Sequence, residues 1–131
     1  MANTYAKPRP ITPDIYQGFI VAADVMPFEW RKSADNPDGM CCRFVISLDA
    51  PDGLANIADC IDCTHVVRLR EVYEATGGDA PPDHHMVDDV HELRGMPCTF
   101  SSKNITPRMG KHAGESKAVV ARWLKPEKAT R

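Results

Sequence analysis

One segment constrains the fold of this chain more than any other, because its residues alternate strictly and a turn follows at once. The two alternating sets along residues 41–49 are Cys42, Phe44, Ile46 and Leu48 on one side and Cys41, Arg43, Val45, Ser47 and Asp49 on the other. A period of two places every second side chain on the same face of a strand, so the first set predicts one buried face. Residues 50–53 carry Pro and Gly where turns favour them, and residues 54–63 can return as an antiparallel strand. The sequence therefore predicts a β-hairpin.

Three further segments favour strands. Residues 16–25 are rich in β-branched and aromatic residues, and Gly18 suits a bend or a close backbone approach. Alternation predicts two more strands, over residues 96–101 and residues 117–124. Together with the hairpin, these segments predict a mainly β protein with five strands and some α-helix.

The helical segments are predicted between the third and fourth strands. A helix is expected over residues 65–76, because Val66, Leu69 and Tyr73 then fall on one face, with Val67 beside them. Thr64 can cap its start, and a pair of glycines ends it. A second, shorter amphipathic turn contains Met86, Val87, Val90 and Leu93.

The length of the chain and its apolar content favour one domain. It has 131 residues, of which 43% are hydrophobic, and this is enough for one core. Three prolines between Lys7 and Pro13 disfavour both helix and central strand, so residues 1–13 are expected to form an extended N-terminal arm. A single domain is then expected over residues 14–126, with a flexible C-terminal tail over residues 127–131.

Five strands, a helix between the third and fourth, and long loops after the first and fourth are the layout of an OB-fold. The chain resembles phage-type OB-fold single-stranded-DNA-binding proteins and their relatives in this order of elements. The resemblance also rests on the segment Leu93-Arg94-Gly95-Met96-Pro97-Cys98-Thr99-Phe100, which leads to a final strand and Lys125-Pro126. It covers residues 16–126. It implies a five-stranded antiparallel OB-like barrel that binds single-stranded nucleic acid without catalysis or cofactor, as an accessory protein of a phage or mobile element.

The two long loops hold the residues that this function needs. In an OB-fold, the loops after the first and fourth strands grip a ligand that lies over strands two and three. The candidate nucleic-acid-binding residues in and around these loops are Phe28, Trp30, Arg31, Lys32, Arg43, Lys103, Arg108, Lys111 and Lys117. Aromatic side chains stack on bases while Lys and Arg neutralise phosphates, so both contributions to single-strand binding are present. The alternative is that Phe28 and Trp30 cover the end of the barrel and that the cations only add solubility.

Charge is distributed unevenly along the chain, and this favours a second functional interpretation. The net charge is −2, yet residues 79–93 contain five acidic and no basic side chains, whereas residues 94–131 contain nine basic and two acidic ones. A basic segment favours an anionic partner. The acidic segment instead favours a protein-interaction module that docks on a host protein and inhibits it, in an accessory or anti-defence role. Both a protein partner and a homodimer therefore stay open.

The five cysteines raise the question of metal binding. Cys60 and Cys63 form a CxxC motif with His65 close by, but neither a second CxxC nor an HxxxH pair accompanies it. Free thiols in a cytoplasmic protein are therefore the expectation, with no metal site. The sequence contains no Gly-rich phosphate loop, nucleophile elbow or HExxH motif, so an enzyme would have to assemble its site from scattered residues. It also contains no stretch of about 18 apolar residues, which disfavours a membrane span. A small zinc-dependent or hydrolytic enzyme is the weakest alternative.

Overall fold

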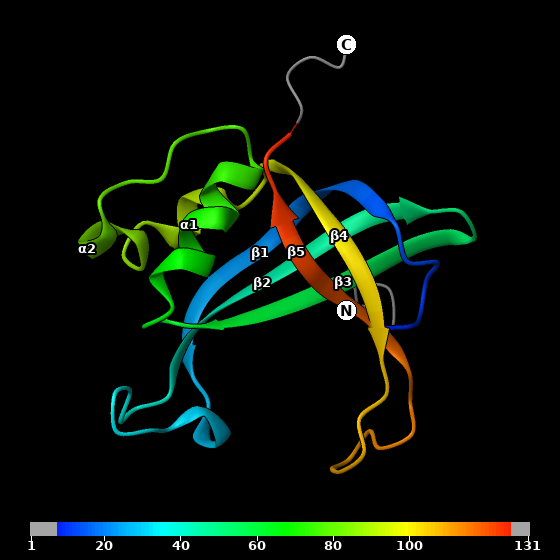
Figure 1. Cartoon of the computed structure of the whole chain (residues 1–131), viewed down its shortest axis with the longest axis horizontal. Coiled ribbons are helices and arrows are strands. Elements are labelled where there is room, and N and C mark those ends of the chain that lie inside the picture. Colours follow the sequence, from blue (N-terminus) through cyan, green and yellow to red (C-terminus); the bar gives the residue numbers. More distant parts are fainter. Residues whose placement is uncertain (1–7, 127–131) are drawn as a thin grey trace, which may run out of the picture.

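The computed structural model describes residues 8–126 and shows a mainly β protein with one five-stranded antiparallel sheet. The strands are β1 (Ile15–Pro27), β2 (Met40–Ala50), β3 (Gly53–Asp62), β4 (Pro97–Ile105) and β5 (Lys117–Leu124). The helical elements are η1 (Glu29–Arg31), α1 (Val66–Ala75), α2 (Asp83–Met86) and η2 (Val90–Leu93). The strands lie in the order β3-β2-β1-β4-β5, with α1, α2 and η2 grouped at one end of the sheet (Figure 1). The N-terminal residues 1–7 and the predicted tail, 127–131, lie outside the described residues.

The central strand β1 belongs to both halves of the sheet because it bends. It pairs with β4 from Ile15 to Phe19 and with β2 from Phe19 to Pro27, and the register shifts between Ile20 and Ala22. Such a bulge inserts one residue and kinks a strand. Gly18 is the close backbone approach that the sequence suggested, because a Cβ at this position would lie 2.8 Å from the Ser47 carbonyl oxygen.

Strand β2 confirms the alternation that predicted it. Cys42, Phe44, Ile46 and Leu48 are all buried in the core. The opposite face is not fully open, however, because Cys41 and Val45 are buried as well. On this part of the sheet the outer face is therefore only partly open, with Arg43 and Ser47 half-buried.

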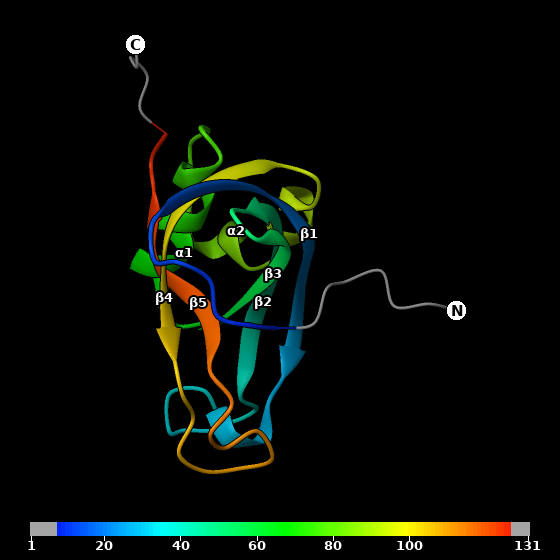
Figure 2. The same ribbon diagram turned by 90° about the vertical axis from the view of Figure 1, so that its right-hand side faces the viewer.

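The sheet curls until its two edge strands, β3 and β5, come near each other (Figure 2). We call the line between them the seam. Trp123 on β5 donates its indole N–H to Asp59 on β3 at 2.7 Å, and Arg68 on α1 donates to the same carboxylate oxygen at 2.9 Å. In the part of the chain that the structure describes, no backbone ladder joins β3 to β5. The sheet is thus open along the seam, and side chains bridge it.

The segment before β1 bridges the other end of the seam. The Arg9 guanidinium donates to the Asp52 carboxylate at 2.8 Å and to the carbonyl oxygens of Gly53 and Leu54. The Arg9 carbonyl oxygen accepts from the backbone N–H of Ala118 on β5 at 3.0 Å. Nearby, Ile11 is buried in the core. The described part of the predicted arm therefore packs on the sheet, and the boundary at residue 14 stays a prediction.

Helix α1 packs its predicted face on the sheet, with two differences. Leu69 and Tyr73 are buried, and the Tyr73 hydroxyl donates to the Met86 carbonyl oxygen at 2.7 Å. Val67 is exposed instead of joining that face. Thr64 does not cap the helix, because its hydroxyl donates to Asp62 at 2.7 Å. Among residues 8–126, no helix has the length and apolar character needed to cross a membrane.

Candidate nucleic-acid interface

The loop between β1 and β2, residues 28–39, is held in one shape by its own backbone. Phe28 donates its N–H to the Gly39 carbonyl oxygen at 2.8 Å, which closes the loop at its base. Gly39 has a φ of 64°, and a Cβ there would collide with the Phe28 carbonyl oxygen. Only glycine fits such a position without strain. The loop that carries the predicted aromatic residues is therefore structured.

Asn36 and Asp62 fix the same loop to the end of β3. The Asn36 side-chain amide donates to the Met40 carbonyl oxygen at 2.8 Å and to the Asp62 carboxylate at 3.0 Å, and its oxygen accepts from the Met40 N–H at 3.0 Å. Asp62 also accepts from the backbone and hydroxyl of Thr64. These hydrogen bonds from Thr64, with the one from Asn36, lower the pKa of Asp62 to about 2. A buried charged carboxylate thus anchors the loop.

Trp30 points into solvent from this loop. Its side chain is 68% exposed, which contradicts the alternative that it covers the end of the sheet. Phe28 is half-buried, and the two ring centroids lie 5.4 Å apart. The Arg31 guanidinium lies 4.7 Å from the centre of the Trp30 ring, and its Nη2 donates to the Cys60 carbonyl oxygen at 3.0 Å. Arg31 therefore ties the exposed indole to β3.

Two of the predicted cations lie at Cys60, on the outer face of β3. Arg43 is its cross-strand partner on β2, and Arg31 binds its carbonyl oxygen from the loop. Burial raises the pKa of the Cys60 thiol, while the positive charges of Arg43, Arg31 and Lys117 lower it in part. Lys117 is the first residue of β5, so part of this positive charge comes from the far edge of the sheet. A loop and two strands thus contribute positive charge here.

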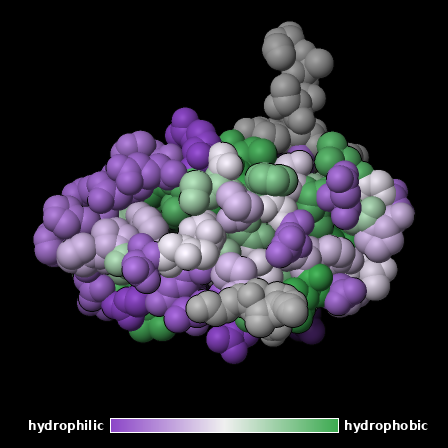
Figure 3. Space-filling view, turned by 90° about the horizontal axis from the view of Figure 1, so that it is seen from above, coloured by the Kyte–Doolittle hydropathy of each residue, from purple (hydrophilic) through white to green (hydrophobic). Residues whose placement is uncertain are grey.

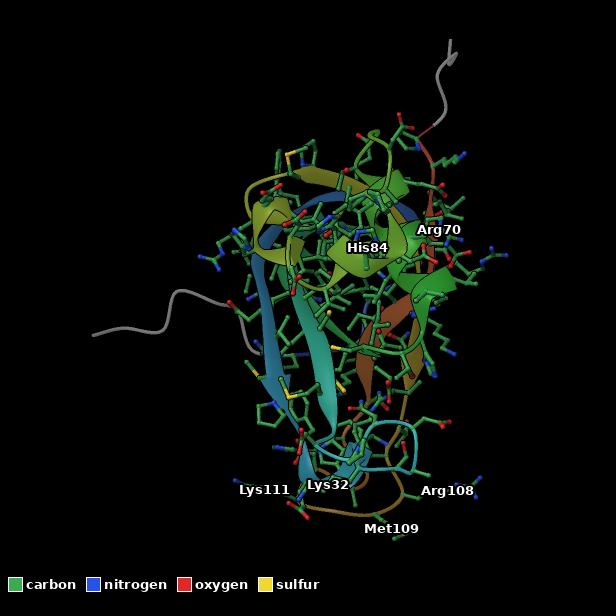
Figure 4. The ribbon with its side chains drawn as sticks, turned by 90° about the vertical axis from the view of Figure 1, so that its left-hand side faces the viewer. Lys32, Arg70, His84, Arg108, Met109 and Lys111 are labelled. Atoms are coloured by element: carbon green, nitrogen blue, oxygen red, sulfur yellow. The ribbon has the colours of Figure 1, made fainter. Side chains whose placement is uncertain are left out.

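The loop between β4 and β5, residues 106–116, extends from the same side of the sheet as residues 28–39 (Figures 1 and 2). It carries Arg108 and Lys111 at its tip, and Met109 between them is 84% exposed. Figure 4 shows Arg108, Met109, Lys111 and Lys32 at one end of the molecule. The two loops stand apart in Figure 1, one at each side of the space below β3.

The predicted residues therefore fall into three groups. Arg31 and Arg43 lie at Cys60, with Trp30 beside Arg31, and the charge of Lys117 acts on the same thiol. Arg108 and Lys111 form the tip of the second loop, and Lys103 lies on β4, exposed. Lys32 is exposed and pairs with Glu29 at 3.1 Å, so it is partly neutralised. Sequence reasoning missed Met109, although an apolar residue between two cations at a glycine-containing turn was its signal.

The CxxC motif does not form one site. Cys60 lies beside Arg43 on the outer face, whereas the sulfur of Cys63 lies 3.8 Å from that of Cys42, which belongs to the core. Within residues 8–126, no three His, Cys, Asp or Glu side chains gather in a way that would hold a metal ion. The histidine next to this motif, His65, lies exposed at the start of α1.

A second surface lies at the opposite end of the molecule. His84, in the acidic segment, is far from Lys32 and Lys111 in Figure 4, and hydrophilic residues gather over this helical end in Figure 3. A groove of about 320 Å3 lies there between α1 and η2, and Asp79, Asp89 and Glu92 are among its lining residues. No protein-family model and no curated protein matches the chain. The geometry of these two surfaces is therefore the basis for the function proposed below.

Proposed function

We propose that this chain is a non-catalytic module that binds single-stranded nucleic acid across the outer face of β3, in an OB-like arrangement. The strand order β3-β2-β1-β4-β5, with α1 between β3 and β4, supports this arrangement. In OB-folds, the ligand lies over the second and third strands between the loops that follow the first and fourth. The corresponding loops here, residues 28–39 and 106–116, extend from the same side of the sheet (Figure 1).

The observation that carries the proposal is the exposed Trp30 beside the cluster of positive charge at Cys60. Trp30 offers a flat face to a base, and stacking on such a face tolerates any sequence. Arg43 and Lys117 are positioned to neutralise phosphates of the same strand. Arg31 already donates to a protein carbonyl oxygen, so its role is to orient Trp30 while adding charge. Arg108 and Lys111 would then hold the strand where it leaves β3.

The test is binding of a fluorescein-labelled oligo-dT to the whole chain, followed by anisotropy at several salt concentrations. We expect micromolar or tighter binding near 50 mM salt that weakens steadily as salt rises, because each neutralised phosphate releases counterions. Unlabelled duplex DNA should compete poorly, since its bases are not free to stack. Absence of salt-dependent binding to both oligo-dT and oligo-U would end the proposal.

The acidic end of the molecule favours a second candidate, a module that docks on a basic host protein. The groove between α1 and η2, with Asp79, Asp89 and Glu92 in its lining, is the surface for such a partner. Charge reversal of these three residues to Lys should then abolish capture of that partner by the tagged chain. Oligonucleotide binding should be retained in the same variant, because the acidic end lies away from Lys32 and Lys111 (Figure 4).

A further inference from the structure

Two cysteines from different strands place their sulfur atoms in direct contact. The Sγ atoms of Cys42 on β2 and Cys63 at the end of β3 are 3.8 Å apart. In the backbone register Cys42 lies opposite Ile61, so Cys63 is its diagonal neighbour. A disulfide needs about 2.05 Å between sulfurs, so closing the 3.8 Å gap takes side-chain rotation together with a small backbone shift, because diagonal neighbours lie further apart than directly paired residues. All five cysteines are free thiols in the structure.

The two sulfurs differ in access and in chemistry. Cys42 is fully buried, whereas Cys63 is partly exposed. The hydrogen bond from the Cys42 thiol lowers the pKa of Cys63, while the same contact and burial raise the pKa of Cys42. Burial raises the pKa of each of the other three thiols, Cys41, Cys60 and Cys98. Since the thiolate is the reactive form, Cys63 is the best nucleophile of the five.

We propose that Cys42 and Cys63 are a reversible oxidation site that a small hydroperoxide converts to a disulfide. The Cys63 thiolate attacks one peroxide oxygen, the O–O bond breaks, and Cys63 becomes a sulfenic acid while the alkoxide takes up a proton and leaves as the alcohol. The Cys42 sulfur then attacks the Cys63 sulfur, the S–O bond breaks, and the hydroxide leaves as water with the Cys42 proton. Two thiols lose two electrons, and the hydroperoxide is reduced to alcohol and water.

The site lies at the base of the loop that carries Trp30. The Cys63 N–H donates to the Met40 carbonyl oxygen at 3.0 Å, and Asn36 donates to the same oxygen at 2.8 Å. Oxidation therefore links the start of β2, to which residues 28–39 return, to the end of β3, on which Arg31 and Asn36 hold the same loop. The chemistry of the thiol pair holds whether or not the loop binds nucleic acid.

The experiment counts thiols in the reduced full chain before and after equimolar hydrogen peroxide, in denaturant with Ellman's reagent. We expect wild type to fall from five thiols to three and to recover all five with dithiothreitol, and to run as a monomer on a non-reducing gel. The matched control is Cys41→Ala/Cys60→Ala, which removes the diagonal pair on the opposite face. It should fall from three thiols to one. Cys42→Ala/Cys63→Ala should keep its three.

Wild type provides a second measurement that needs no variant. Trypsin leaves residues 33–43 and 44–68 as separate peptides, each with two cysteines, and fragmentation of the linked pair identifies the bonded ones. A bond between Cys42 and Cys63 supports the proposal. A bond through Cys41 or Cys60, a cross-linked dimer, or no loss of thiols overturns it.

Discussion

Asp59 joins three elements of the fold through one carboxylate oxygen. A single carboxylate oxygen accepts from the Trp123 indole at 2.7 Å and from Arg68 at 2.9 Å, so it joins β3 to β5 and to α1. Its side chain is only 14% exposed, and removal leaves a partly buried guanidinium and an indole N–H without their acceptor. Its contribution therefore exceeds that of a surface ion pair.

The expected result of Asp59→Ala is a loss of about 2–3 kcal/mol of unfolding free energy, measured by urea denaturation. Emission of Trp123 should change in the native state as well, because its hydrogen bond is gone. The matched control is Asp83→Ala, which removes the exposed ion pair with Arg70 at 2.7 Å. That variant should lose about 0.5 kcal/mol or less. Equal losses in the two variants would refute the role of Asp59.

Asp62 makes stability depend on pH in the acid range. Its pKa is lowered from 3.8 to about 2 by hydrogen bonds from Thr64 and Asn36. A carboxyl whose folded pKa lies below its unfolded value stabilises the protein above the unfolded value, and this contribution is lost as pH falls from about 4 to 2. The effect is on the order of 1–2 kcal/mol.

Melting curves of wild type and Asp62→Asn between pH 2 and 7 measure this contribution. Wild type should melt higher at pH 5 to 7, and the two curves should converge near pH 2. The exposed Asp49 provides the control, since Asp49→Asn should follow wild type at every pH. A constant gap between wild type and Asp62→Asn down to pH 2 would show that the carboxylate charge is not what stabilises the loop.

The loop of residues 28–39 should contribute stacking to binding. Trp30→Ala is expected to cost about 1–3 kcal/mol of affinity for oligo-dT while leaving the salt slope nearly unchanged, because stacking releases no counterions. Trp30→Phe should keep most of the affinity, since a flat ring remains. Val67→Ala, which removes an exposed apolar side chain on α1, serves as the control and should bind as wild type. Melting temperatures of all three variants should match, because Trp30 is exposed.

Strands β2 and β5 should contribute charge to the same event. For single strands each phosphate contact adds about 0.7 to the logarithmic salt slope, so Arg43→Ala/Lys117→Ala should lower the slope by about 1.4. Arg70→Ala/Arg122→Ala removes the same charge from α1 and another part of β5, where both residues form ion pairs with acidic side chains. It should leave the slope as in wild type. A similar drop in both double variants would mean that only net charge matters.

These elements also show what the sequence alone could predict. The five strands and α1 were predictable from local signals, which are alternation for β2, β4 and β5, β-rich composition for β1, a turn for β3 and helical spacing for α1. The burial of Cys41 and Val45 on the other face of β2 was not predictable, because it depends on what the curled sheet and its loops cover. The prediction that Thr64 caps α1 was wrong for a similar reason, because its hydroxyl donates to the nearby Asp62 carboxylate instead.

The candidate interface was likewise predictable only in part. The residue types were visible in the sequence. The exposure of Trp30 shows that its side chain does not cover the end of the sheet. The meeting of Arg31 and Arg43 at Cys60 and the effect of the Lys117 charge on the same thiol were not visible, because these residues belong to a loop, β2 and β5. No local pattern links residues so far apart in the chain.

The molecule as a whole places its acidic segment away from the two loops. The loops with Lys32, Arg108 and Lys111 lie at one end, and the acidic segment of residues 79–93 lies at the other (Figure 4). Residues 28–39 and 106–116 together carry four basic and four acidic side chains, whereas residues 79–93 carry five acidic and no basic ones. In the proposed binding mode, an anionic strand is therefore repelled from the acidic end and held by individual Lys and Arg side chains at the other.

The contacts that join Arg9 and Ile11 to β4 and β5 affect how the chain folds during its synthesis on the ribosome. Some partners of Arg9 and Ile11 are synthesised much later than these two residues: Asn104, 93 positions after Ile11, binds the Ile11 backbone through both polar atoms of its side-chain amide, and the backbone N–H of Ala118 donates to the Arg9 carbonyl oxygen. Contacts this distant in sequence form late in folding. A nascent chain that stops before β5 should stay protease-sensitive, and resistance should arise in one step once β5 has left the exit tunnel. Synthesis from the N-terminus thus produces Arg9 and Ile11 well before their partners on β4 and β5.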